Sequence, residues 1–315
     1  MTGTAQNSGD SISHRGGNIP GTRKPAYSLT LSGELPVPVI LAVPHAGRSY
    51  PDGLWKRMRR PEWSALRLED RFVDRIAAEV ARQTGAGLLV SHAPRALIDL
   101  NRATDDVDWT MVAEGAPSGS ATPKPNQRAR SGLGLVPRRL PGLGEIWSGP
   151  MSGSELDARI GQVHLPYHRA LEGALESARD RWGAALLLDL HSMPPLKPAH
   201  PRDRVAEFVV GDRFGASADD RLVACTLREL AQNGAMVAHN RPYAGGYVLD
   251  RHANLRTGVH AIQIEICRSL YLSDDLLETT GGLGEVAATL SRLIRVLAGE
   301  VATFGRIRDM PLAAE

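Results

Sequence analysis

The 315-residue sequence has little lysine, little cysteine and few aromatic residues: four lysines, two cysteines, and 5% Phe, Trp and Tyr. Of the 37 basic residues 33 are therefore arginines, and against 35 acidic residues they leave a net charge of only +2. A near-balanced charge argues against a general nucleic-acid-binding protein, which carries a basic stripe to displace counterions from phosphates. Cys225 and Cys267 are too few for a disulfide framework or a four-thiolate zinc site, and we expect two buried, reduced thiols.

Long apolar runs are also absent, and none approaches the ~18–20 residues that a membrane-spanning helix needs. The N-terminus lacks the succession of charged, apolar and small residues that marks a signal peptide. These absences predict a soluble, cytoplasmic protein with no membrane partner, and they give no indication of its oligomeric state. Residues 1–24 are rich in Ser, Gly, Thr and Asn, and they have too few large apolar side chains to offset the entropy of ordering. We therefore predict a disordered tail over residues 1–24.

The rest of the chain alternates aliphatic, strand-like runs with amphipathic, helix-like segments. Strands are predicted over 36–43, 87–90, 96–100, 184–190, 206–210, 235–238 and 259–266, and helices over 65–83, 154–181, 218–232 and 284–304. Several of the strand runs are apolar throughout, which is typical of strands covered on both faces. The alternation predicts a three-layer α/β/α sandwich with a mixed, mostly parallel sheet.

One stretch interrupts this alternation. Between residues 104 and 153 the sequence turns to Gly, Pro, Ser and Arg without clear periodicity. A loop of that length in a compact domain is usually functional or disordered. We favour a single domain over residues 25–315 with a long loop insertion at about 104–153, rather than two domains.

Polar residues follow several of the predicted strands, and ligands of open α/β sheets bind beyond the carboxyl ends of the strands. The residues at these positions are His45, Asn101, Arg102, His191 and Glu265. A single histidine at a strand end is more often structural than functional, whereas two of them leave the structural and the functional interpretation evenly balanced. Glu265 lies within the alternation of Ile262, Ile264 and Ile266, so its side chain projects from the opposite face of that strand. Burying a carboxylate there is costly unless it is paired or functional.

A metal ion is the simplest way to make the two histidines and nearby carboxylates act together. Neutral imidazoles suit zinc, and a catalytic zinc takes three ligands from His, Asp or Glu and leaves a position for water. The third ligand is expected from the acidic segment 68–74, which begins only about 25 residues after His45, although acidic residues are common at a helix N-terminus without any metal. Asp189 lies two residues before His191, on the same strand face, and would orient its imidazole.

The adjacent Asn101 and Arg102 have two possible interpretations. They could be an ordinary polar pair in a loop, or an amide and a guanidinium that bind a substrate carboxylate in bidentate fashion.

Seven short motifs occur in order along the chain. They are VPHAGR at 43–48, LEDRFVD at 68–74, PRALIDLNR at 94–102, DLHSMP at 189–194, GDRFG at 211–215, NRPYAGGY at 240–247 and EICRSLY at 265–271. In this order they resemble the N-formylglutamate amidohydrolase family, and they span roughly residues 39–274. Any one motif is a weak signal, whereas seven in the same order are specific.

The resemblance implies a phosphorylase/hydrolase-like α/β fold, one Zn²⁺ per chain, and hydrolysis of N-formyl-L-glutamate to formate and L-glutamate in histidine degradation. By analogy with zinc carboxypeptidases of that fold, His45, Asp70 and His191 would hold the zinc, with Glu69 as the alternative to Asp70. Glu265 would be the general base that activates a zinc-bound water.

The partner is then a small N-acyl acidic amino acid. Because N-formylglutamate carries two carboxylates, it needs cationic partners, and we expect Arg102 to take part in catalysis as well as in binding. The full set of expected substrate-binding residues is Arg95, Asn101, Arg102, Arg241, Gly245, Gly246 and Arg268.

Two other functions stay open on the sequence alone. One is a metallo-deacylase or exopeptidase with the same metal site and a different substrate pocket. The other is a family member without turnover that binds a ligand.

Overall fold

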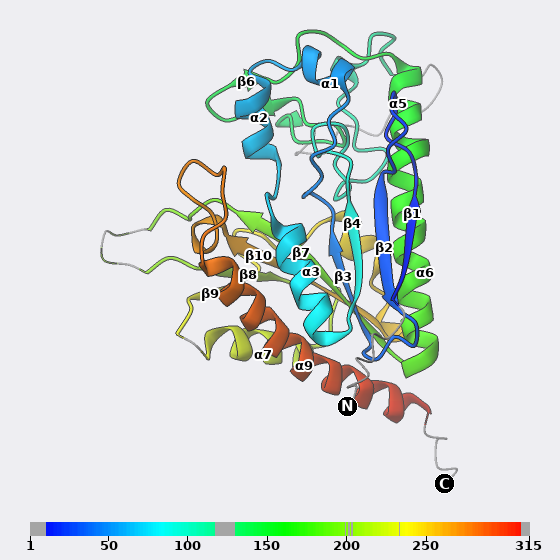
Figure 1. Cartoon of the computed structure of the whole chain (residues 1–315), viewed down its shortest axis with the longest axis vertical. Coiled ribbons are helices and arrows are strands. Elements are labelled where there is room, and N and C mark those ends of the chain that lie inside the picture. The colour runs from blue at the N-terminus through cyan, green and yellow to red at the C-terminus, as the bar shows by residue number, and fades with distance from the viewer. Residues whose placement is uncertain are drawn as a thin grey trace, which may run out of the picture.

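A mixed sheet of eight strands lies at the centre of the computed structural model, which describes residues 11–116, 130–198, 200, 202, 204–232 and 234–309 (Figure 1). In spatial order its strands are β1 (Ser11–Gly16), β2 (Tyr27–Ser32), β4 (Gly87–Ser91), β3 (Val39–Val43), β7 (Ala185–Met193), β10 (Val259–Cys267), β8 (Phe208–Gly211) and β9 (Val237–His239). Within this described part, four neighbouring pairs are parallel and three are antiparallel. The predicted mixed, mostly parallel sheet is confirmed.

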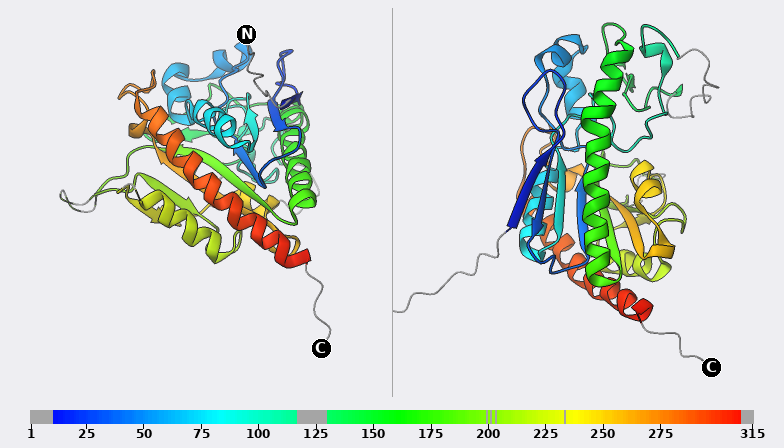
Figure 2. Two further views of the ribbon diagram at one scale, coloured as in Figure 1. Left: turned by 60° about the horizontal axis from the view of Figure 1, so that its bottom comes forward. Right: turned by 90° about the vertical axis from the view of Figure 1, so that its right-hand side faces the viewer.

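Helices cover both faces of this sheet (Figures 1 and 2). On one face α3 (Val73–Thr84), α7 (Asp220–Ala231) and α9 (Gly282–Asp309) share one apolar core with the sheet. On the other face α6 (Leu165–Trp182) and α8 (Tyr247–His252) share a second apolar core with it. The predicted three-layer α/β/α arrangement is therefore confirmed. In the described residues, no helix is both long and apolar enough to cross a membrane.

The alternation of side chains along β7 decides which layer the polar residues face. Leu186, Leu188 and Leu190 pack into the core under α9, whereas Leu187 packs into the core under α6. Asp189 and His191 have the same parity as Leu187, so they lie on the α6 side of the sheet.

The predicted helix over 65–83 is wrong in one respect that matters for the site. It is two helices, α2 (Pro61–Leu68) and α3, and Phe72 between them has a left-handed backbone with φ 61°. This break turns Glu69 and Asp70 out of helical register. Upstream of it, α1 (Asp52–Arg57) has no counterpart in the predicted elements.

The predicted strand over 96–100 is also wrong, because these residues form turns. Their apolar side chains are buried under α6 and the neighbouring loops rather than in the sheet. The predicted helix over 154–181 becomes α5 (Gly153–Arg159), a π-helical turn (Ile160–His164) and α6.

The tail and the loop insertion are more ordered than the sequence predicts. Ser11–Gly16 forms the edge strand β1, which pairs with β2, and Ile19 is fully buried. The prediction of disorder is therefore wrong for these residues, because backbone pairing to an exposed edge needs little apolar surface; residues 1–10 lie outside the described part.

Within 104–153 the described residues include a 3₁₀ turn (Trp109–Met111) and the hairpin of β5 (Arg139–Leu140) and β6 (Gly144–Glu145). Leu135 and Ile146 are fully buried there. Residues 117–129 of the predicted insertion are outside the described part.

Candidate active site

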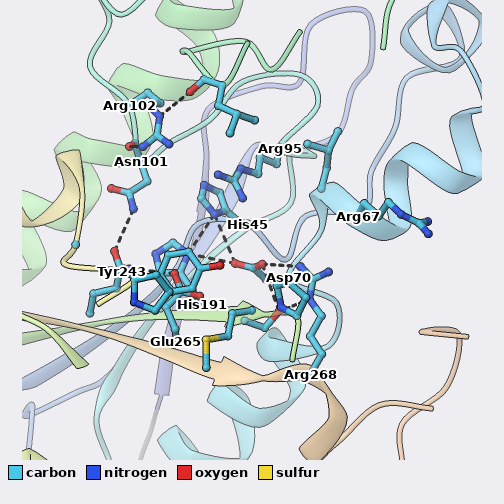
Figure 3. A pocket seen from close by; sticks show the side chains of 18 of the residues that line it. His45, Arg67, Asp70, Arg95, Asn101, Arg102, His191, Tyr243, Glu265 and Arg268 are labelled. Atoms are coloured by element: carbon cyan, nitrogen blue, oxygen red, sulfur yellow. Dashed lines mark hydrogen bonds and ion pairs between the residues drawn. The ribbon is translucent and has the colours of Figure 1, made fainter. Parts of the chain in front are cut away.

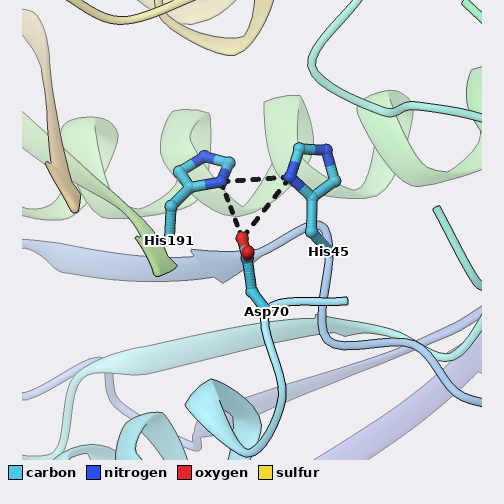
Figure 4. Close-up of side chains that lie close together, drawn as sticks. All are labelled: His45, Asp70 and His191. Atoms are coloured by element: carbon cyan, nitrogen blue, oxygen red, sulfur yellow. Dashed lines mark hydrogen bonds and ion pairs between the residues drawn. The ribbon is translucent and has the colours of Figure 1, made fainter. Parts of the chain in front are cut away.

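Three buried side chains converge at the carboxyl ends of the central strands (Figure 4). The Nδ1 atoms of His45 and His191 lie 3.1 Å apart, and Asp70 Oδ2 lies 3.1 Å from His191 Nδ1 and 3.5 Å from His45 Nδ1. All three residues are at most 3% exposed. Imidazole and carboxylate donors converging on one buried point are a ligand set suited to zinc.

The protons of the two imidazoles show why a cation fits between them. His45 Nε2 lies 2.7 Å from Asp99 Oδ1, and His191 Nε2 lies 2.8 Å from Asp189 Oδ2. An ionised carboxylate only accepts hydrogen bonds, so each Nε2 carries a proton, and each ring in its neutral form would direct the Nδ1 lone pair at Asp70. The lone pairs of the two Nδ1 atoms and of Asp70 Oδ2 then point at one another, and a metal ion or an added proton is needed to offset their repulsion.

The pKa values in the cluster reflect the same crowding of negative charge. Burial opposes protonation of His191, but Asp189 and Asp70 raise its pKa well above the usual value. Burial likewise disfavours the charged form of Asp70, but the two imidazoles hold its pKa well below the usual value. The cluster therefore keeps an ionised carboxylate next to a site that favours positive charge.

The break between α2 and α3 brings Asp70 to the histidines. The backbone N–H of Asp70 donates to the carbonyl of His45 at 2.9 Å. Arg268 donates from Nη2 to Asp70 Oδ1 at 3.2 Å and to the carbonyl of Glu69 at 2.8 Å. The side chain of Glu69 instead accepts from Arg71 at 3.0 Å, outside the cluster. Of the two acidic candidates, the structure thus places Asp70 with the histidines.

Glu265 lies on β10, directly beside His191 in the parallel register of β7 and β10. Its side chain is buried, and burial together with the charges of Asp70 and Asp189 raises its pKa to about 7, although His191 and Arg95 oppose this. A carboxyl group with a pKa near neutrality can both take and return a proton at the working pH.

Glu265 and the cluster line one cavity of about 430 Å³ (Figure 3). Four arginines, Arg67, Arg95, Arg102 and Arg268, contribute to its wall. The wall also includes Asn101, Tyr243, Gly245 and Gln263. A small anionic substrate therefore meets several cations and two carboxylates in this cavity.

Buried histidines hold the turn that carries the Asn-Arg pair. His164 Nε2 donates to the carbonyl of Arg102 at 2.8 Å, and His168 Nε2 donates to that of Leu100 at 3.0 Å. His252 Nε2 lies 2.9 Å from His168 Nδ1, which must accept because its other nitrogen donates. Burial lowers the pKa of all three histidines, so they stay neutral and keep the turn fixed.

Known proteins match this chain in sequence and in fold. A model of the N-formylglutamate amidohydrolase family matches residues 37–272. This chain belongs to that family. The crystal structure of N-formylglutamate amidohydrolase from Ralstonia eutropha JMP134 is 33% identical with a TM-score of 0.78, covering 88% of this chain and 99% of that one.

Two curated relatives of this chain are N-formylglutamate deformylases. N-formylglutamate deformylase of Pseudomonas aeruginosa is 26% identical over 86% of this chain and 95% of its own length. The deformylase of Pseudomonas putida is 26% identical over 76% of this chain and 83% of its own length. The chain is accordingly an amidohydrolase.

Not every residue expected at the site of this amidohydrolase lines the cavity. Arg241 is exposed and is absent from the cavity wall in the described part of the chain. The preceding Asn240 has φ 59° and its side chain is bonded to Asp212, and after this turn Pro242 and Tyr243 reach the wall instead. The expectation that Arg241 binds substrate is therefore not supported by its position.

Arg268 and Gly246 are near the site but have other contacts. Arg268 lines the cavity, yet its described hydrogen bonds go to Asp70, Ser192 and the Glu69 carbonyl, so it holds the ligand cluster. Gly246 packs against Asn101 rather than facing the cavity.

Sequence reasoning missed several residues of this amidohydrolase site. Gln263 precedes Glu265 by two residues and shares its strand face, so the period of two could have found it. Asp99 supports His45, a role parallel to that expected for Asp189. Arg67 and Tyr243 reach the cavity from α2 and from the loop before α8, and no sequence pattern connects those segments to the metal cluster.

Replacing Gly246 by alanine is expected to lower kcat/KM by about 10- to 100-fold, because small misplacements of a binding group cost this much. A Cβ at this position would lie 2.6 Å from Asn101 Oδ1 and would push the amide away. The measurement is steady-state kinetics of the purified variant on N-formylglutamate. Gly173→Ala is the matched control, since nothing lies within 4 Å of the Cβ it adds. Wild-type kinetics for Gly246→Ala would contradict this role.

Proposed function

We propose that this amidohydrolase hydrolyses N-formyl-L-glutamate to formate and L-glutamate, and that it takes one Zn²⁺ at His45, Asp70 and His191. The reaction's place in histidine degradation belongs to the same proposal. The observation that carries it is the convergence of the three buried donors beside Glu265, in a chain of this family. A zinc ion there would supply a Lewis acid that polarises the amide carbonyl and lowers the pKa of water.

Glu265 is the general base in this proposal. It faces the cavity beside His191 and accepts a proton from the water that attacks the formyl carbon. It then gives this proton to the nitrogen as the carbon–nitrogen bond breaks, which releases formate and the free amine of glutamate. A carboxyl group with a raised pKa suits both steps.

The arginines of the cavity account for the anionic substrate. Arg95 donates from Nε to Asp99 at 2.9 Å and still lines the cavity, and Arg102 is anchored by the Leu133 carbonyl and its neighbour's carbonyl. Guanidinium groups anchored in this way can bind a carboxylate without losing much further conformational entropy. We propose that Arg95, Asn101 and Arg102 bind the substrate carboxylates, with Gly245 allowing close approach of the backbone, and that Arg102 helps to stabilise the oxyanion.

Two measurements test this proposal together. Elemental analysis of the purified protein is expected to give about one zinc per chain, the stoichiometry of a single three-ligand site. A panel of N-formyl, N-acetyl and N-succinyl amino acids, followed by release of the free amine, is expected to show the fastest turnover with N-formylglutamate. Absence of metal together with no formate release after zinc addition would overturn the proposal, and faster turnover of another N-acyl amino acid would replace the substrate.

A further inference from the structure

A row of three hydrogen bonds runs from α8 through Asn101 and Gln263 to Glu265, and these three side chains line the cavity. The backbone N–H of Val248, in α8, donates to Asn101 Oδ1 at 2.9 Å. Asn101 Nδ2 donates to Gln263 Oε1 at 3.3 Å, and Gln263 Nε2 donates to Glu265 Oε1 at 3.0 Å. The three side chains are at most 8% exposed, so water competes little with these bonds.

The backbone N–H of Val248 fixes the donor and the acceptor of each of these three hydrogen bonds. A backbone N–H can only donate, so the atom of Asn101 that faces Val248 is the oxygen, and the nitrogen faces Gln263. The atom of Gln263 that meets this nitrogen must be its oxygen, which leaves the Gln263 nitrogen facing Glu265. Glu265 Oε1 therefore always accepts in this arrangement.

We infer that Gln263 is a positioning residue, which orients the Glu265 carboxylate and the Asn101 amide relative to one another. The inference rests on the proposed function, in which these two groups act on opposite ends of the substrate. Gln263 holds Glu265 Oε1, so the other carboxylate oxygen is the one presented to the attacking water. It also occupies one N–H of Asn101, so the second N–H is the one offered to a substrate carboxylate.

The central sheet holds Gln263 in place, and Gln263 can therefore fix the orientation of the Glu265 carboxylate relative to the Asn101 amide. It lies on β10 between β7 and β8, opposite Asp189 and Gly211 in register, and is 4% exposed. A side chain on a central strand has little freedom, and a displacement of about 1 Å between reacting groups can cost about 10²-fold in rate. Gln263 thus links the substrate-binding turn to the base through its hydrogen bonds to Asn101 and Glu265.

The test is steady-state kinetics of Gln263→Met, with Ile264→Val as the control. Methionine keeps the volume of glutamine and removes both hydrogen bonds, and we expect kcat to fall by about 10²-fold, with a rise in KM and unchanged zinc content. Ile264 is a fully buried neighbour facing the other core, so its valine variant reports the effect of a small loss of packing alone. Its kcat and KM are expected to match those of the wild type.

A second variant decides the matter if Gln263→Met does not fold. Gln263→Glu keeps the shape and still accepts from Asn101, but it replaces the donor to Glu265 by a second carboxylate 3.0 Å away. Two such carboxylates share a proton, so kcat is expected to fall by about 10²-fold or more.

Wild-type kcat in a folded Gln263 variant would overturn the inference. The wild-type enzyme is assayed alongside, on the best substrate of the panel. If the wild type does not turn over N-formylglutamate, the proposed function is contradicted. If the wild type is active and the Gln263 variants have the same kcat, only the role of Gln263 is contradicted.

Discussion

Replacing Glu265 by glutamine is expected to lower kcat by at least about 10²-fold, the usual size of a general-base contribution. Glutamine keeps the shape of the side chain and can still meet Gln263, but it cannot take a proton from water. Since Glu265 is not among the three converging ligands, zinc content is expected to stay at the wild-type level. Steady-state formate release and elemental analysis of the same preparation measure both quantities.

Glu69→Gln is the matched control for this experiment. Glu69 is also a buried carboxylate near the cluster, and its side chain pairs with Arg71 outside the cavity wall. Its glutamine variant is expected to retain both zinc and turnover. Unchanged turnover in Glu265→Gln would remove Glu265 from the mechanism, and loss of zinc from Glu69→Gln would return Glu69 to the ligand set.

The layers of the fold could be predicted because local patterns determine them. The strands β3, β7 and β10 are buried along their whole length, and the many aliphatic residues in their sequences indicate central strands. The parity of Glu265 against Ile264 and Ile266 also gave the correct face, because side chains alternate strictly along a strand.

The break after α2 could not be predicted from periodicity. Residues 65–83 keep a helical pattern through Glu69–Phe72, yet tertiary contacts favour a left-handed Phe72 and a backbone bond from Asp70 to the His45 carbonyl. Such contacts join segments about 25 residues apart, and a local pattern carries no information about them.

The edge strand β1 and the turn at 96–100 were missed for related reasons. β1 is polar and is held by backbone pairing to β2, which side-chain patterns do not register. The turn at 96–100 is apolar because it is buried under α6, and a short apolar run is ambiguous between a strand and a buried loop.

Replacing His191 by alanine is expected to weaken zinc binding by more than about 100-fold, and to abolish turnover with it. Removal of an outer partner of a metal-bound histidine typically costs 10–100-fold, and loss of the ligand itself exceeds this. Asp189→Asn is therefore expected to fall between His191→Ala and the wild type, since Asp189 only holds the Nε2 proton of His191 at 2.8 Å. The measurement is zinc affinity by competition with a chelator, with turnover recorded at saturating zinc.

The order of zinc affinity among His191→Ala, Asp189→Asn and the wild type tests which ring nitrogen of His191 faces the metal. His92→Ala serves as the control, because His92 is a partly buried histidine outside the cavity wall. If His191 were instead a packed structural histidine, His191→Ala would bind zinc like His92→Ala, and the ligand set would have to be sought elsewhere. If Asp189→Asn bound zinc as weakly as His191→Ala, Asp189 would be a ligand in its own right. The intermediate affinity expected for Asp189→Asn follows from a cluster in which Nδ1 of His191 faces the metal and Asp189 holds the opposite nitrogen.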